Sequence, residues 1–347
     1  MSRLRPTART FRAFLPLYPA AIESFDLSSY DLVVSSSSAW AHAVICDEST
    51  VHVCYCHNPF RYAWNDRDRT LARRRDPITR ALLRGQFRRW RQWDWIAAQR
   101  VDRYVANSRA TQARIGAYFG RDSRIVHPPV DTRRFRPGRV RDYYIVLAEL
   151  MPHKRIDVAI EAFNRLGRPL VVVGDGPGGR ALQRLAGPSI RFTGRVSDRG
   201  VETLLEGARA LVMPAAEEFG IAAVEAQAAG RPVIAVGAGG ALETIVEDVT
   251  GCVWTGGAAE LAEAVRAFDD GAVDPRACVA NAARFDRQIF ERRLLDEIDS
   301  VFADGRFRRP LERLPLRSTS MIQRAIGDGV VVMPSQYAPD GRLHGGL

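Results

Sequence analysis

Short apolar runs that end at proline or glycine recur along the chain and alternate with stretches whose apolar positions have helical spacing. Residues 211–213 form one such run, stopped by Pro214, and residues 233–236 form another after the breakers Gly230 and Pro232. Alanine-rich sequence that favours a helix lies between the two runs. This segment therefore predicts a strand, a loop, a helix, a Gly-Arg-Pro turn and a second strand.

The same alternation continues over most of the chain, which predicts an α/β protein. The other apolar runs that read as strands are residues 30–38, 51–55, 101–107, 143–147, 169–173 and 189–194. Residues 156–163 and 290–302 have apolar positions at helical spacing, and residues 11–25 read as a helix interrupted by Pro16 and Pro19. No apolar strand followed by glycines opens the chain, although doubly wound domains usually begin in that way.

A cluster of helix and strand breakers indicates a domain boundary near residue 138. Pro128, Pro129, Pro137 and Gly138 fall within a few residues of one another,. A chain of 347 residues most simply makes two domains,. We therefore expect an N-terminal domain over residues 1–138, a second domain over 139–284, a C-terminal helix over 285–304 and a poorly ordered tail over 305–347, to which we assign no function.

The composition and the lengths of the apolar runs indicate a globular protein without membrane spans. The hydrophobic fraction of 46% and the charged fraction of 26% are ordinary for a soluble globular chain,. No apolar run approaches the ~18 residues that a membrane span requires, and no signal-peptide core is present. These features predict a cytoplasmic protein. Its net charge of +10 comes almost entirely from arginine, because Lys154 is the single lysine, and a compact ammonium is suited to contact a phosphate,.

The cysteines predict neither disulfides nor a metal centre. The five cysteines include no CxxC pair and no evenly spaced framework,. His52, Cys54, Cys56 and His57 lie close together, but on an extended strand the first three share one face and His57 takes the other,. That arrangement lacks zinc-finger spacing, and we expect no metal.

Two acids in the 211–236 segment give it candidate chemistry. Glu217 lies in the predicted loop, and Glu225 lies about two turns along the helix that Phe219 and Gly220 open,. Free amides at a helix N-terminus suit a diphosphate, and an acid in the helix can accept hydrogen bonds from sugar or ribose hydroxyls. The pattern favours a nucleotide-sugar site. The alternative is a capped helix with a solvated acidic first turn.

A glycine motif offers a different interpretation. Gly174, Gly176 and Gly179 satisfy GxGxxG, the dinucleotide fingerprint, and would indicate an NAD(P)-binding oxidoreductase,. The motif lies in mid-chain and contains Pro177, and Asp198 only loosely matches the acid expected about 20 residues later,.

Several strings together resemble glycosyltransferase family 4, whose members are retaining enzymes of the GT-B fold. These strings are EEFGIAAVEAQAAGRPVIA, GGALETI, CHNPFRYAW, VANSR, IVHPPVDTRRF, MPHKRIDVAIEAFN, GDGP and TGCVW. The resemblance implies two Rossmann-like domains that face each other across a cleft, with the last helix returning to the first domain. It also implies that the first domain is incomplete, because family members begin with a βαβ segment that this chain lacks.

The resemblance assigns roles to particular residues. His57 is the acceptor-domain residue that meets the donor sugar and the reaction centre. In the donor domain, Glu217 contacts hydroxyls of the donor sugar. Lys154 touches the donor diphosphate, Glu225 holds the ribose, and the segment that contains Arg195 borders the base. The remaining donor-binding residues are Gly174 and Gly176 in the nucleotide pocket and Phe219, Gly220 and Ile221 at the helix start.

Two positions depart from the family pattern. Asn65, directly after the CHNPFRYAW string, replaces an acid that is usual there in the family, and Glu149 stands where many members carry an arginine close to the diphosphate. The implied reaction is transfer of a sugar, plausibly mannose from GDP-mannose, to a glycan or lipid-linked hydroxyl, with no cofactor. The rival interpretation is a truncated, non-catalytic remnant that binds a nucleotide sugar.

Residues 67–100 are dense in arginine and tryptophan. Basic charge with aromatic groups is typical of nucleic-acid binding, and also of an amphipathic helix on an anionic membrane surface. A solvated helix with tryptophans in the core fits equally well. We favour membrane-surface contact because acceptors in the resembled family are often lipid-linked, and we expect no nucleic-acid partner.

Overall fold

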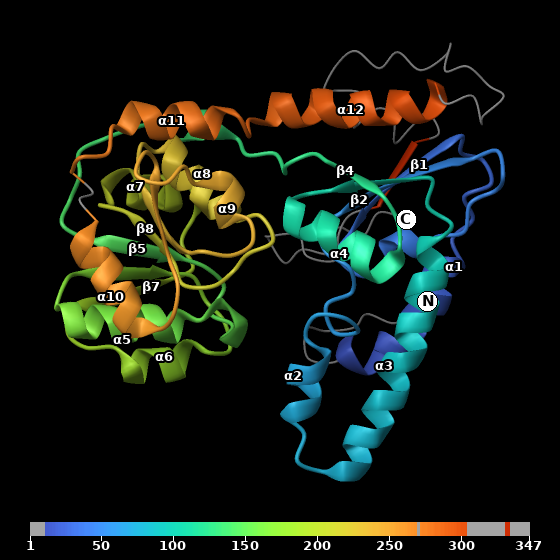
Figure 1. Ribbon diagram of the computed structural model, residues 1–347, viewed down its shortest axis with the longest axis horizontal. Coiled ribbons are helices and arrows are strands. Elements are labelled where there is room, and N and C mark those ends of the chain that lie inside the picture. The colour runs from blue at the N-terminus through green and yellow to red at the C-terminus, as the bar shows by residue number, and fades with distance from the viewer. Residues whose placement is uncertain (1–10, 269–270, 304–329, 334–347) are drawn as a thin grey trace. The chain divides into compact units, whose positions relative to one another are not determined.

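The computed structural model describes residues 11–268, 271–303 and 330–333 (Figure 1). The chain divides into two compact units, the first comprising the chain up to Val126 together with the chain from Arg292 on, and the second comprising His127–Glu291. The boundary expected at residue 138 thus lies inside the second unit. In the part of the chain that the structure describes, every helix is too short or too polar to cross a membrane.

The first unit contains a parallel sheet of five described strands. In order across the sheet they are β11 (Val330–Met333), β1 (Leu32–Ser37), β2 (Val51–Cys56), β3 (Arg103–Ala106) and β4 (Ser123–Ile125). The predicted strands at 30–38, 51–55 and 101–107 are therefore confirmed. β11 lies in the stretch for which we expect a poorly ordered tail, and the rest of 305–347 lies outside the described residues.

Helices and aromatic side chains build the core of the first unit. Its helical elements are η1 (Phe11–Leu17), α1 (Tyr18–Glu23), η2 (Ala41–Ala43), α2 (Arg67–Ala72), α3 (Pro77–Ala98), α4 (Arg109–Phe119) and the larger part of α12 (Arg287–Ala303). Trp40 is fully buried and packs against Phe60, Trp90 and Trp93. Two tryptophans of the 67–100 stretch thus belong to the core, whereas Trp95 is about half exposed.

The second unit contains a six-stranded parallel sheet. Its strands lie in the order β10 (Gly251–Trp254), β9 (Val233–Val236), β8 (Leu211–Met213), β5 (Tyr144–Leu147), β6 (Leu170–Val173) and β7 (Ile190–Gly194). Side chains alternate between the two faces of each strand. Ile145, Val171 and Leu211 therefore enter one apolar cluster, while Tyr144, Val172 and Val212 enter another.

Helices cover both faces of this sheet, as in doubly wound folds. α7 (Asp198–Gly207), α8 (Ile221–Ala228) and α11 (Pro275–Ala283) contribute to the first cluster, and α5 (Ile156–Leu166) and α10 (Ala258–Ala267) contribute to the second. The other helical elements are η3 (Thr132–Arg134), η4 (Pro152–Lys154), α6 (Gly179–Leu185) and α9 (Ala241–Thr244). The strand, helix and strand predicted for residues 211–236 are confirmed as β8, α8 and β9.

Candidate functional site

Lys154 and Glu217 form an ion pair in the second unit. Lys154 ends η4, which follows β5, and Glu217 lies in the loop after β8. The Lys154 ammonium lies 2.7 Å from both carboxylate oxygens of Glu217. The two side chains are 23% and 22% exposed, so the pair faces solvent on one side. Both residues follow the carboxyl ends of neighbouring parallel strands, which is where α/β sheets place ligands,.

Two glycines fix the backbone that carries Glu217. The amide of Gly240 donates to the carbonyl of Glu217 at 2.9 Å. Gly239 has a φ of +65°, and a Cβ at that position would lie 2.2 Å from the same carbonyl oxygen. A Cβ on Gly240 would lie 2.1 Å from the carbonyl of Phe219. Only glycines allow the two loops to approach this closely.

Glu225 lies in the second turn of α8. This is closer to the helix start than the two turns expected from the sequence, because α8 begins at Ile221. Gly220 has a left-handed φ of +87° and is the N-cap, so Phe219 lies outside the helix. Burial raises the pKa of the Glu225 carboxyl to about 7, and the charge of Arg134 opposes this rise. A carboxyl that titrates near neutrality in a mostly buried place is a common feature of functional sites.

A hollow of about 300 Å³ lies beside the glycine-rich turn after β6. Gly174 and Gly176 line it, together with Leu150, Phe192 and Gly194. The backbone around it is close-packed: a Cβ on Gly174 would lie 2.0 Å from the carbonyl oxygen of Ala148, and one on Gly176 2.8 Å from the amide of Leu150. Arg195 follows Gly194 directly, but it is exposed and is not among the residues that line the hollow.

Phe219 belongs to an aromatic cluster that the sequence does not indicate. Phe219 is buried, and its ring lies 5.4 Å from the ring of His127 and 5.3 Å from that of Phe285. His127 Nε2 lies 3.0 Å from Glu243 Oε2. The two residues lie 116 positions apart in the sequence, which gives no signal that they pair.

His57 lies in the first unit, directly after β2. Its amide donates to the carbonyl of Ser37 at 2.7 Å, and its Nε2 is hydrogen-bonded to Ser36 Oγ at 2.8 Å. Thr111 Oγ1 donates to the His57 carbonyl at 3.0 Å, and the Tyr55 ring packs edge-on against the imidazole. The imidazole is therefore held from β1 and β2, and its backbone from α4.

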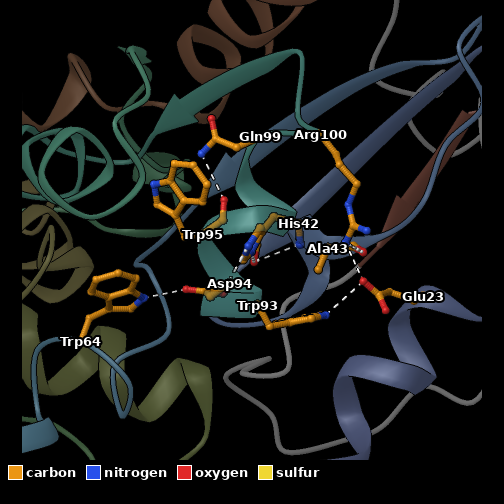
Figure 2. Close-up of polar contacts among 10 residues, drawn as sticks. Glu23, His42, Ala43, Trp64, Trp93, Asp94, Trp95, Gln99 and Arg100 are labelled. Carbon is orange, nitrogen blue, oxygen red and sulfur yellow. Dashed lines mark hydrogen bonds and ion pairs between the residues drawn. The ribbon is translucent and has the colours of Figure 1, made fainter. Parts of the chain in front are cut away.

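We call residues 57–66, between β2 and α2, the His57 loop. A buried polar network holds this loop near its second end, at Trp64 (Figure 2). Asp94 of α3 is fully buried and accepts a hydrogen bond from Trp64 Nε1 at 2.6 Å. Its other oxygen lies 3.3 Å from His42 Nε2. The Trp64 ring stacks on Tyr118 at 4.7 Å, and the Arg91 guanidinium lies 4.5 Å from it. Asp94 and His42 carried no functional signal in the sequence.

The structure thus brings together part of the predicted set. Lys154 contacts Glu217, while Phe219 and Gly220 lead into α8, in which Ile221 and Glu225 lie. Gly174 and Gly176 line a hollow in the same unit, next to which Arg195 is exposed. His57 belongs to the other unit. Glu149, the departure from the family pattern close to the proposed diphosphate contact, is exposed.

Two protein-family models match the chain. The model described as Glycosyltransferase Family 4 matches residues 2–134, and the model described as Glycosyl transferases group 1 matches residues 132–285. Similar curated proteins include a GDP-mannose-dependent alpha-(1-6)-phosphatidylinositol monomannoside mannosyltransferase of Mycolicibacterium smegmatis, 32% identical over 206 residues. A D-inositol 3-phosphate glycosyltransferase of Mycobacterium bovis is 31% identical over 183 residues. The matched regions cover 50% and 45% of this chain and 53% and 38% of those proteins.

Solved structures confirm the fold. Anabaena HepE in complex with UDP and glucose superposes with a TM-score of 0.61 at 18% identity, over 85% of this chain and 84% of that one. Sucrose-phosphate synthase from Thermosynechococcus elongatus gives a TM-score of 0.64 at 17% identity, over 85% and 79%. The architecture is therefore that of GT-B proteins, with two Rossmann-like domains. With both halves matched by glycosyltransferase models, the chain belongs to the group 1 glycosyltransferases of family 4.

Proposed function

We propose that this chain transfers a hexosyl group from a nucleoside diphosphate sugar to a hydroxyl acceptor and retains the anomeric configuration. The observation that carries the proposal is the Lys154–Glu217 pair, an ammonium and a carboxylate 2.7 Å apart after neighbouring strands of a Rossmann-like sheet. The glycine-lined hollow and Glu225 lie in the same unit. Together these groups supply a cation for a diphosphate and two carboxyls for hydroxyl groups.

Each group has a role in the proposed reaction. A diphosphate leaving group gains negative charge as the glycosidic bond breaks, and a preorganised cation such as Lys154 stabilises that charge. Glu217 would accept hydrogen bonds from the sugar hydroxyls, and Glu225 from the ribose. The backbone at Phe219, Gly220 and Ile221 would face the diphosphate, and Arg195 would border the base. His57 would act on the acceptor side.

We propose GDP-mannose as the donor. The GDP-mannose-dependent enzyme of Mycolicibacterium smegmatis is 32% identical to this chain over the matched region, which supports this choice over other donors. HepE was solved with UDP and glucose, so a uridine donor is the main competitor. The 300 Å³ hollow would receive the base, and the identity of the base is what a binding experiment would decide.

We further propose a glycan or lipid-linked acceptor and contact with a membrane surface through residues 67–100. At the start of α3 the side chains of Ile78 and Leu82 are each 71% exposed. Arg84, Arg88 and Arg91 follow on the same helix, at a spacing that places them along one side,. An apolar tip beside a basic stripe is typical of helices that lie on anionic lipid.

Turnover tests this proposal. The purified chain would be incubated with GDP-mannose or UDP-glucose and vesicles containing phosphatidylinositol, and release of the nucleoside diphosphate would be measured. We expect release with GDP-mannose, reduced about 100-fold or more by Glu217→Gln. Glu218→Gln makes the same charge change at the next residue and should leave release unchanged. Nucleotide binding without release from either donor would instead identify a non-catalytic nucleotide-sugar binder.

A further inference from the structure

The outer neighbour of β1 comes from the opposite end of the sequence. β11 pairs with β1 in parallel and in unbroken register, from Leu32 opposite Val330 to Ser35 opposite Met333. In Figure 1, β11 appears as the red strand beside the blue β1. On its other side, β1 pairs with β2 along its whole length. Among the described strands, β11 is the one that makes β1 an interior strand of the sheet.

The chemistry of β1 suits an interior position. Leu32 and Val33 are almost completely buried, and Ser35 and Ser37 are buried as well. An apolar strand at the edge of a sheet leaves a row of N–H and C=O groups unpaired and invites association with other chains. A parallel neighbour pairs this outer row of β1, and β11 then forms the outer edge of the described sheet,. Valine, which fills three of the four β11 positions, is among the residues that favour strands,.

The sequence of β11 resembles the strand with which doubly wound domains usually open. Doubly wound domains usually open with an apolar strand followed by a glycine-containing turn. Residues 330–333 are such an apolar run, and the first glycine after it is Gly341. The pattern and the observed pairing both assign residues 330–333 to the place that a strand preceding β1 would occupy.

We propose that the C-terminal strand is an integral part of the first unit's sheet, bound intramolecularly at the outer edge of β1. Parallel strands end at the same edge of a sheet, so β11 ends at the edge where β2 leads into His57. Met333 pairs with Ser35, and the next residue of β1, Ser36, is hydrogen-bonded to the His57 imidazole. The strand thus supports the part of β1 that holds His57. This assignment does not depend on the proposed transferase activity.

Hydrogen exchange in the full-length chain tests the assignment. Proline has no N–H and cannot donate to a ladder, and the N–H groups of consecutive strand residues point to opposite sides. One of the two variants Val331→Pro and Val332→Pro must therefore remove a hydrogen bond to β1. We expect that variant to speed exchange of the β1 amides roughly tenfold or more. Val331→Thr retains the N–H and should exchange like the wild type.

Two further measurements test whether the variants still fold and whether the pairing is intramolecular. Exchange in β3 of the first unit, which pairs with β2 and β4, should be unchanged, which would show that this unit still folds in the variants. If both proline variants leave β1 protected as in the wild type, the proposal is wrong. Light scattering at several concentrations would detect pairing between copies; a dimer whose β1 protection falls on dilution would overturn the intramolecular assignment.

A cross-link gives an answer even if the proline variants fail to fold. Leu32→Cys with Val330→Cys places thiols on partner positions of neighbouring strands, within the distance that a disulfide spans,. Mass spectrometry should find this disulfide within a single chain after mild oxidation. Ile45→Cys, at an exposed position outside the strand, combined with Val330→Cys is the matched control and should not cross-link. Equal cross-linking of both pairs would contradict the observed register.

Discussion

Glu225 shows how burial sets the chemistry of one side chain. Its pKa rises from 4.5 to about 7, mainly because the buried carboxylate loses hydration, and the nearby Arg134 only partly restores the charged form,. Between pH 4.5 and about pH 7, the folded chain therefore keeps Glu225 protonated, whereas the unfolded chain releases the proton. A carboxyl in this state can change charge near neutral pH when a ligand binds.

The raised pKa predicts a pH dependence of stability. Because the native state binds the proton more tightly, the contribution of Glu225 is fully present below pH 4.5 and is lost as the pH rises to about 7,. The loss should amount to up to about 3 kcal/mol. Glu225→Gln removes the titration, so its stability relative to the wild type should increase between these pH values. Urea unfolding at pH 5 and pH 8 checks this, and a constant difference would contradict it.

For single residues, the sequence indicated which side chains are candidates for the site but not which side chains they contact. Lys154 was identified because it is the single lysine, and Glu217 by its place in a resembled motif. That these two side chains form an ion pair was not predicted. His127 and Glu243 lie 3.0 Å apart, yet neither has a neighbour in sequence that indicates the contact. Contacts between distant positions depend on how the loops fold, which apolar spacing does not encode.

At the scale of elements, Glu217 is positioned by a close contact between two loops. One loop follows β8 and carries Glu217, and the other follows β9 and carries Gly239. Gly239→Ala should displace this loop, because the new Cβ would lie 2.2 Å from the Glu217 carbonyl oxygen. Gly167 has the same φ of +65° with open space around it, so Gly167→Ala isolates the backbone strain. We expect both variants to lose about 1 kcal/mol from that strain. Only Gly239→Ala should also weaken nucleotide binding in a calorimetric titration; equal binding by the two variants would contradict this.

Asp94 links α3 to the His57 loop. Asp94→Ala would leave the Trp64 indole N–H and the buried His42 without their partner, at a cost of about 3 kcal/mol or more,. Asp94→Asn keeps an acceptor for Trp64 and should recover part of that loss. Urea denaturation followed by tryptophan fluorescence would measure both variants. Identical stability of the alanine variant and the wild type would show that the network does not hold the loop.

Local elements were more predictable than their pairing. The runs at 211–213 and 233–236 predicted β8 and β9 because apolar strands bounded by breakers carry a strong local signal,. The start of α8 was misplaced by two residues because Gly220 adopts a left-handed φ as the N-cap, which composition does not reveal. β11 was assigned to a poorly ordered tail, since its partner β1 lies about 300 residues away and nothing local indicates the pairing.

At the scale of the whole molecule, the chain has two sheets with separate apolar clusters. The clusters around Trp40 and Tyr104 belong to the first unit, and those around Ile145 and Tyr144 belong to the second. Calorimetry should therefore resolve two unfolding transitions. A nucleoside diphosphate that binds the second unit should raise the midpoint of only one of them. A single transition that shifts as a whole would show that the units unfold together.

The central claim is that the second unit binds a nucleoside diphosphate through Lys154. Calorimetric titration of the chain with GDP, UDP and NAD tests it most directly. We expect GDP to bind, with affinity lowered about tenfold or more by Lys154→Ala, since the variant loses a charged contact with phosphate. Arg165→Ala, an exposed position with the same change of charge, should bind like the wild type. Absence of binding by both GDP and UDP, or binding of NAD alone, would contradict the account.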